Sequence, residues 1–170
     1  MKNVNVMIDL ETMSTACNAA ICSIGAVKFT LEDGIIDKFY CTVDAADCKS
    51  LGLHIDKQTV EWWSKQPKHV LEQLVKDTIP LREALRKFSV WYGTSSLPTW
   101  GCGAGFDNVI LENAYKAVSF NRPWKFWDDR CYRTIKEIIK LPEEERGENY
   151  HNALDDALYQ TRHLLKIMGS

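Results

Sequence analysis

The chain has 170 residues, of which 45% are hydrophobic and 26% charged, and its formal net charge is −2. These proportions are typical of an ordinary globular protein and exclude a disordered or fibrous chain. They also exclude a protein that holds a polyanion by positive charge alone, so a nucleic-acid partner would require bound cations with acidic ligands. The longest apolar runs fall short of a membrane span, and Asp9 and Glu11 interrupt the early apolar stretch where a secretory signal would lie. We therefore expect a cytoplasmic protein.

The first part of the chain is expected to form an antiparallel meander of three strands. Three apolar segments are separated by turn signals, and the Asp-Gly pair at 33–34 favours a tight hairpin between the second segment and the third. The strands are expected over residues 3–10, 20–30 and 35–43.

The remainder of the chain is expected to be mainly helical. Prolines stand at two helix starts, and Asp56 is suited to cap another helix. Residues 97–102 are short, apolar and followed by glycines, which indicates a fourth strand that is parallel to its neighbours. The helices are expected over residues 56–64, 67–76, 80–92, 107–117, 130–140 and 152–168, with an exposed polar loop at 141–150. This order predicts one α/β domain over residues 1–170, with a core at about 4–168 and a mixed sheet flanked by helices.

Two carboxylates are expected to point to one place at the end of the first strand. Asp9 and Glu11 are two residues apart, so in an extended chain they project to the same face. Carboxylates held together repel each other unless they share a proton or a cation. The alternative is a polar strand end in solvent, which is commoner for an isolated acidic pair.

Asp107 follows a glycine-rich turn between the fourth strand and a buried helix. Glycine allows close approach of backbone or substrate, so this aspartate could face the crevice beyond the strand ends. Its alternative role is to cap the helix.

The last helix offers two adjacent aspartates, and helical periodicity separates them. Asp156 shares a face with Ala153 and Ala157, whose small side chains allow close approach to a sheet, whereas Asp155 lies on a polar side. Asp156 is thus the better candidate ligand. His151 precedes this helix and could reach the same site, although a histidine near a helix start is usually a capping or surface residue.

Together these residues indicate metal-dependent chemistry. Carboxylate oxygens without thiolates suit Mg²⁺ or Mn²⁺. Two such ions about 4 Å apart can stabilise the attacking and leaving oxygens of a phosphoryl displacement. A histidine beside them could accept the proton of the attacking water.

Four motifs in this order resemble those of the DEDDh, or DnaQ-like, 3′–5′ exonuclease superfamily, which has a ribonuclease H-like fold. They are IDLET at 8–12, IGAV at 24–27, GFD at 105–107 and the His151–Asp156 pair. The resemblance runs from about Val4 to Met168. The segment TVEWW at 59–63 resembles a narrower branch, the ribonuclease T-like and phage exonuclease A-like proteins.

The resemblance implies a role for each motif residue. Asp9, Glu11 and Asp156 would hold a first metal ion, Asp9 would bridge to a second with help from Asp107, and His151 would be the general base. Members hydrolyse the terminal phosphodiester of RNA or DNA from the 3′ end and release 5′-mononucleotides, and small members often form homodimers. One segment departs from the family, because Gly-Cys-Gly-Ala-Gly precedes the Phe-Asp pair where His-Asn is common.

Four residues are candidates for contact with the substrate. Met13 lies where members often wedge the terminal base, and Phe106 belongs to the third motif. Trp124 and Trp127 lie near cationic residues and could stack on bases, although clustered tryptophans are more often core or dimer contacts. Of the adjacent pair at 62–63, one tryptophan is expected inside and the other at an interface. Two other functions remain open, a nuclease-like binding or scaffolding module and a ribonuclease H-type endonuclease.

Overall fold

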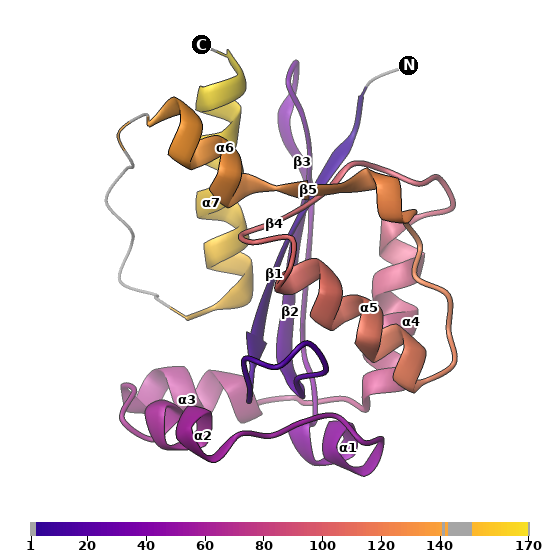
Figure 1. Ribbon diagram of the computed structural model, residues 1–170, viewed down its shortest axis with the longest axis vertical. Helices are drawn as coiled ribbons and strands as arrows, with labels where there is room; N and C mark the ends of the chain where they lie inside the picture. The colour runs from indigo at the N-terminus through magenta and orange to yellow at the C-terminus, as the bar shows by residue number, and fades with distance from the viewer. Residues whose placement is uncertain (1–2, 141, 143–150, 170) are drawn as a thin grey trace.

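A five-stranded mixed sheet forms the centre of the computed structural model, which describes residues 3–140, 142 and 151–169 (Figure 1). The strands lie in the order β3-β2-β1-β4-β5, with β1 antiparallel to β2 and β2 to β3, and with β1 parallel to β4 and β4 to β5. Their bounds are β1 Asn5–Thr12, β2 Ile21–Thr30, β3 Gly34–Thr42, β4 Thr99–Gly101 and β5 Asp129–Cys131. The predicted meander and parallel fourth strand are confirmed.

Helices cover both faces of the sheet. In Figure 1, α7 and α6 lie on one side and α4 and α5 on the other, while α1, α2 and α3 lie together beyond the end of β1. The bounds are α1 Ala45–Ser50, α2 Lys57–Trp63, α3 Lys68–Val75, α4 Leu81–Tyr92, α5 Asp107–Ala117, α6 Tyr132–Ile139 and α7 Ala153–Gly169, with a 3-10 helix η1 at Phe126–Asp128. Within the described residues, no helix is long and apolar enough to span a membrane.

Local signals define most helix starts. Asp56 caps α2 by accepting a hydrogen bond from the Thr59 N–H at 2.9 Å, as predicted. Pro67 and Pro80 stand one residue before the first helical residue of α3 and α4, so each helix begins one residue later than predicted. The pattern predicts neither α1 nor β5, and the helix expected over 130–140 begins only at Tyr132 because β5 occupies the residues before it. Most of the expected loop at 141–150 lies outside the described residues.

The two faces of β1 have different neighbours, because side chains alternate along a strand. Val6, Ile8 and Leu10 belong to the core cluster that includes residues of α4 and α5. Met7 belongs to a second cluster together with residues of α7. Asp9 is on the same face as Met7, so its carboxylate points toward α7.

Gly25 allows α7 to lie unusually close to the sheet. This residue of β2 pairs with Asp9 in the register, and a Cβ atom built on it would overlap the backbone of Ala153 and Leu154. Only a residue without a side chain allows this approach. The contact therefore fixes the first turn of α7, which carries Asp156, against the end of β1.

We expect Gly25→Ala to destabilise the protein by at least about 2 kcal/mol, because the new methyl group would push the backbone of α7 away from the sheet. A thermal unfolding midpoint about 4–8 °C lower would correspond to this loss. Gly105→Ala is the matched control, since a Cβ there would meet nothing within 4 Å. Equal midpoints for the two variants would contradict the close approach.

Candidate active site

Three carboxylates meet where β1 ends against the first turn of α7. Asp9 and Glu11 come from β1 and Asp156 from α7, and each offers an oxygen within 4.8 Å of the others. Glu11 is buried, whereas Asp9 and Asp156 are half-buried. Asp155, by contrast, is exposed. Helical periodicity thus separated the two neighbouring aspartates correctly.

Asp107 approaches the same place from α5. It is the first residue of this helix, and Phe106 occupies the capping position, so Asp107 is not the cap. Its Oδ1 atom accepts a hydrogen bond from the backbone N–H of Leu10 at 3.2 Å. A Cβ atom on Gly101 would overlap the side chain of Asn108 and touch that of Asp107, so this glycine leaves room for the start of α5. The hydrogen bond fixes the buried Asp107 against the backbone of Leu10, the residue between Asp9 and Glu11 in the sequence.

Burial raises the pKa values of Asp9, Glu11 and Asp107, and repulsion by neighbouring carboxylates adds to the rise for Asp9 and Glu11. The pKa of Asp9 lies well above its usual range because of burial, and because Asp107, Glu11 and Asp156 lie near. Burial, followed by the charges of Asp156 and Asp107, raises the pKa of Glu11 to about 8. Burial raises the pKa of Asp107 to about 7, although backbone N–H groups oppose the shift. Such a cluster is short of positive charge, and its hard oxygen donors fit a divalent cation.

Gln160 is a site residue that the sequence did not predict as one. Its Nε2 atom donates a hydrogen bond to Asp9 Oδ1 at 2.7 Å, and the residue is buried on α7. Gln160 stands four residues after Asp156, on the same helical face, so the periodicity contained a signal for it. The bond fixes the orientation of the Asp9 carboxylate.

His151 lies beside the carboxylates and against α2. It lines the same cavity as Asp9, Glu11 and Asp156. Its ring meets the ring of Trp62 edge-on, with centroids 4.9 Å apart, and that of Trp63 at 5.9 Å. These contacts hold the imidazole at the edge of the carboxylate cluster.

The two tryptophans of α2 face different sides of the helix, and one of them is inside, as predicted. Trp63 is buried and donates a hydrogen bond from Nε1 to the backbone oxygen of Thr12 at 2.9 Å, whereas Trp62 is 43% exposed. Trp63 therefore ties α2 to the end of β1, and Trp62 presents an aromatic surface next to His151.

Two cavities adjoin each other at the site. The carboxylate cavity, of about 230 Å³, is lined by Asp9, Leu10, Glu11, Cys102, Phe106, Asp107, Arg133, His151, Asp156 and Gln160. The second, of about 410 Å³, is lined by Leu10, Glu11, Thr12, Ser14, Thr15, Asp56, Gln58, Thr59, Trp62, Trp63 and Phe106. Its volume falls within the range of small-molecule sites. Leu10, Glu11 and Phe106 line both, so a molecule in the second cavity would reach the carboxylates.

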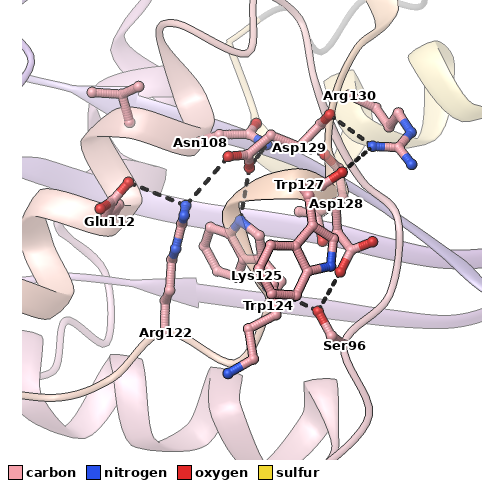
Figure 2. Close-up of polar contacts among 12 residues, drawn as sticks. Ser96, Asn108, Glu112, Arg122, Trp124, Lys125, Trp127, Asp128, Asp129 and Arg130 are labelled. Carbon is pink, nitrogen blue, oxygen red and sulfur yellow. Dashed lines mark hydrogen bonds and ion pairs between the residues drawn. The ribbon is translucent and has the colours of Figure 1, made fainter.

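Two of the predicted substrate-binding residues line neither site cavity. Trp124 is only 1% exposed and donates a hydrogen bond from Nε1 to Asp129 Oδ1 at 2.8 Å (Figure 2). It is a core residue, and the prediction that it stacks on bases is wrong. Met13 is half-buried, packs against two core clusters and lines neither site cavity. The core therefore accounts for Trp124, whereas the contact of Met13 with the terminal base stays a prediction.

Trp127 is exposed but lies away from the carboxylates. Its side chain is 61% exposed on η1, which precedes β5. Because β5 runs parallel to β4 and β1, with Asp129 level with Thr99 and Thr99 level with Val6, η1 lies at the opposite end of these strands from Asp9. Figure 2 shows the polar contacts of Asp128 and Asp129 that hold this turn. Trp127 therefore lies away from the carboxylates, and its stacking on bases stays a prediction.

The raised pKa values predict how metal-free protein responds to pH. An acid whose pKa is raised by folding binds its proton more tightly in the folded state, so stability is lost as the pH rises from its unfolded pKa through its folded pKa. For Glu11 this window extends from 4.5 to about 8. We expect the unfolding midpoint in EDTA to fall by about 5 °C between pH 5 and pH 8.5, and Mn²⁺ to restore it at pH 8.5. The Glu11→Gln variant should show a smaller fall, and a midpoint independent of both pH and Mn²⁺ would contradict this electrostatic picture.

The mixed sheet, flanked by helices on both faces, has the ribonuclease H-like fold that the sequence predicted. Residues 4–168 match the family described as the Rv2179c-like 3′-5′ exoribonuclease domain. The chain belongs to this family, and it is a 3′-5′ exonuclease. The resemblance to DEDDh exonucleases seen in the sequence is confirmed.

Similar proteins agree with this classification. An exodeoxyribonuclease of Enterobacteria phage T4 is 25% identical over 162 residues, covering 79% of this chain and 71% of that protein. The nuclease domain of 3′hExo, a DEDDh family member solved with bound rAMP, has a TM-score of 0.68 at 12% identity over 99% of this chain and 92% of that one. E. coli Exonuclease I, solved with a dT13 oligonucleotide, has a TM-score of 0.70 at 12% identity over 98% of this chain and 41% of that one. The two structures establish the common fold.

Proposed function

We propose that the protein removes 5′-mononucleotides, one at a time, from the 3′ end of single-stranded or 3′-overhanging RNA or DNA, and that hydrolysis depends on two divalent cations, Mg²⁺ or Mn²⁺. The observation that carries the proposal is the cluster of three carboxylates within 4.8 Å of one another, beside a cavity of about 410 Å³. Asp9, Glu11 and Asp156 would hold the first cation. Asp9 and Asp107 would serve the second.

The residues around the carboxylates have distinct roles in this reaction. Bound cations would stabilise the attacking and leaving oxygens of the displacement at phosphorus. His151 would accept a proton from the attacking water as the new P–O bond forms, and the 3′ oxygen would take up a proton from solvent as its bond to phosphorus breaks. Trp62 and Trp63 would keep its ring at the carboxylates, since both rings lie within 6 Å of it. Gln160 would hold the Asp9 carboxylate in place.

The second cavity would receive the terminal nucleoside. Phe106 lines both cavities, and Trp62 offers an exposed aromatic surface at the same place. Aromatic side chains stack on bases without strong sequence preference, which suits an enzyme that must accept each successive nucleotide. An acidic enzyme with a net charge of −2 would then hold its substrate through metal ions and stacking.

A gel time course on 5′-labelled RNA and DNA of the same sequence tests the proposal. The substrates would be single strands, a duplex with a 3′ overhang, and a circle, each with Mg²⁺, Mn²⁺ or EDTA. We expect a ladder that shortens from the 3′ end, requires the metal and spares the circle. The relative rates rank RNA against DNA.

Three other results would point elsewhere. Cleavage of the circle would indicate a ribonuclease H-type endonuclease, and binding without cleavage by a metal-loaded protein would indicate a scaffolding module. Release of dinucleotides or nucleosides would contradict the proposed cleavage position. The homodimer stays a separate prediction, which light scattering during size-exclusion chromatography would check.

A further inference from the structure

Helix α6 places a positively charged side chain, that of Arg133, at the carboxylate cavity. Arg133 lines this cavity together with Asp9, Asp107 and Asp156. Among the described residues that line it, Arg133 is the only lysine or arginine. The classification as an exonuclease does not assign a role to this residue.

The loop before α5 holds the guanidinium group of Arg133. Its Nη2 atom donates a hydrogen bond to the backbone oxygen of Cys102 at 3.0 Å. Gly103 adopts a φ of +100°, a conformation that favours glycine, and a Cβ atom there would lie 3.6 Å from the central carbon of the guanidinium, an ordinary van der Waals distance. Arginine carries five N–H donors, so this bond leaves donors for a ligand, and the side chain is exposed.

The same loop has no polar side chain other than the thiol of Cys102. Residues 101–105 read Gly-Cys-Gly-Ala-Gly, where the related pattern commonly has His-Asn. Because this loop offers the cavity little besides its backbone and a thiol, Arg133 is the strong hydrogen-bond donor on this side. A planar guanidinium matches the oxygens of a phosphate well.

The position of Arg133 relative to the two cavities indicates which phosphate it meets. Leu10, Glu11 and Phe106 line both cavities, whereas Arg133 and Cys102 line only the carboxylate cavity. With the terminal nucleoside in the larger cavity and its 5′ phosphate at the carboxylates, the strand would continue past Arg133. The metal cations would already neutralise the scissile phosphate, which leaves the next phosphate for the arginine.

We propose that Arg133 binds the first phosphate on the 5′ side of the scissile phosphodiester, an inference that rests on the proposed function. Arg133 would then be a substrate-binding residue that favours oligonucleotides over single nucleotide esters. A charge-assisted hydrogen bond of this kind corresponds to a roughly 10- to 100-fold change in kcat/KM.

Two substrates test this assignment. A trinucleotide contains the 5′-side phosphate, whereas the p-nitrophenyl ester of thymidine 5′-phosphate has only the scissile one. We expect Arg133→Ala to lower kcat/KM by about 10- to 100-fold on the trinucleotide and to leave the ester within about threefold of wild type. Arg162→Ala is the matched control, because Arg162 is an exposed arginine of α7 that lines neither site cavity.

A chemical change in the substrate isolates the contact. A trinucleotide with a neutral methylphosphonate at the 5′-side linkage should slow wild type by the same factor and Arg133→Ala hardly at all. Equal losses on trinucleotide and ester, or full activity of Arg133→Ala on the trinucleotide, would overturn the assignment. If wild type with Mn²⁺ hydrolysed neither substrate, the proposed function itself would be overturned, and the inference with it.

Discussion

Asp9→Asn is expected to reduce hydrolysis to background, a loss of about 10⁴-fold or more in kcat. Asp9 provides an oxygen within 4.8 Å of those of Glu11 and Asp156, and the proposed mechanism has it serve both cations. The amide is nearly the same size but carries no charge, so metal binding should fail while the fold persists. In EDTA at pH 8.5 the variant should even be more stable than wild type, because it removes one of several mutually repelling charges.

The neighbouring aspartates of α7 provide the matched comparison. Asp156→Asn should lose activity like Asp9→Asn, whereas Asp155→Asn should retain it, because Asp155 is exposed and lies outside the carboxylate cluster. Initial rates with saturating Mn²⁺ and circular dichroism spectra of each variant would check both expectations. A folded Asp9→Asn protein with the wild-type rate would refute the metal assignment.

His151→Ala is expected to lower kcat by about 10²- to 10⁴-fold, the usual range for a general base. Because His151 lies beside the carboxylates without being one of the three clustered ligands, Mn²⁺ affinity should change little. His69→Ala, a histidine of α3 outside both site cavities, is the control.

Two results would show that His151 is not the general base. An unchanged kcat with a raised KM would mean that the imidazole contacts the substrate without moving a proton. A loss of Mn²⁺ affinity in His151→Ala would mean that it acts through the metal site.

The sequence predicted those parts of the site that depend on local periodicity. Alternation along a strand placed Asp9 and Glu11 on one face, and helical spacing selected Asp156 over Asp155. Both patterns are properties of a single element, so they need no knowledge of the tertiary structure. The three-stranded meander was predictable for the same reason.

The remaining parts depend on contacts between distant elements. Nothing in the composition of residues 129–131 distinguishes a three-residue strand, because β5 forms only through its pairing with β4. The position of Arg133 beside Cys102 depends on that pairing too. Trp124 was misjudged because cationic neighbours suggest a nucleic-acid surface, whereas here Arg122 pairs with Glu112 and Asp129 above a buried indole (Figure 2).

The measurement that tests the central claim most directly is an anomalous difference map from crystals of the protein soaked in Mn²⁺. Manganese is located by its own scattering, so the result depends neither on an assay nor on a choice of substrate. We predict one strong peak bounded by Asp9, Glu11 and Asp156, and a second near Asp9 and Asp107 once a nucleoside 5′-monophosphate is added. Crystals of an active protein with no peak at these carboxylates, or with manganese bound elsewhere, would contradict the assignment of this cluster as the catalytic metal site.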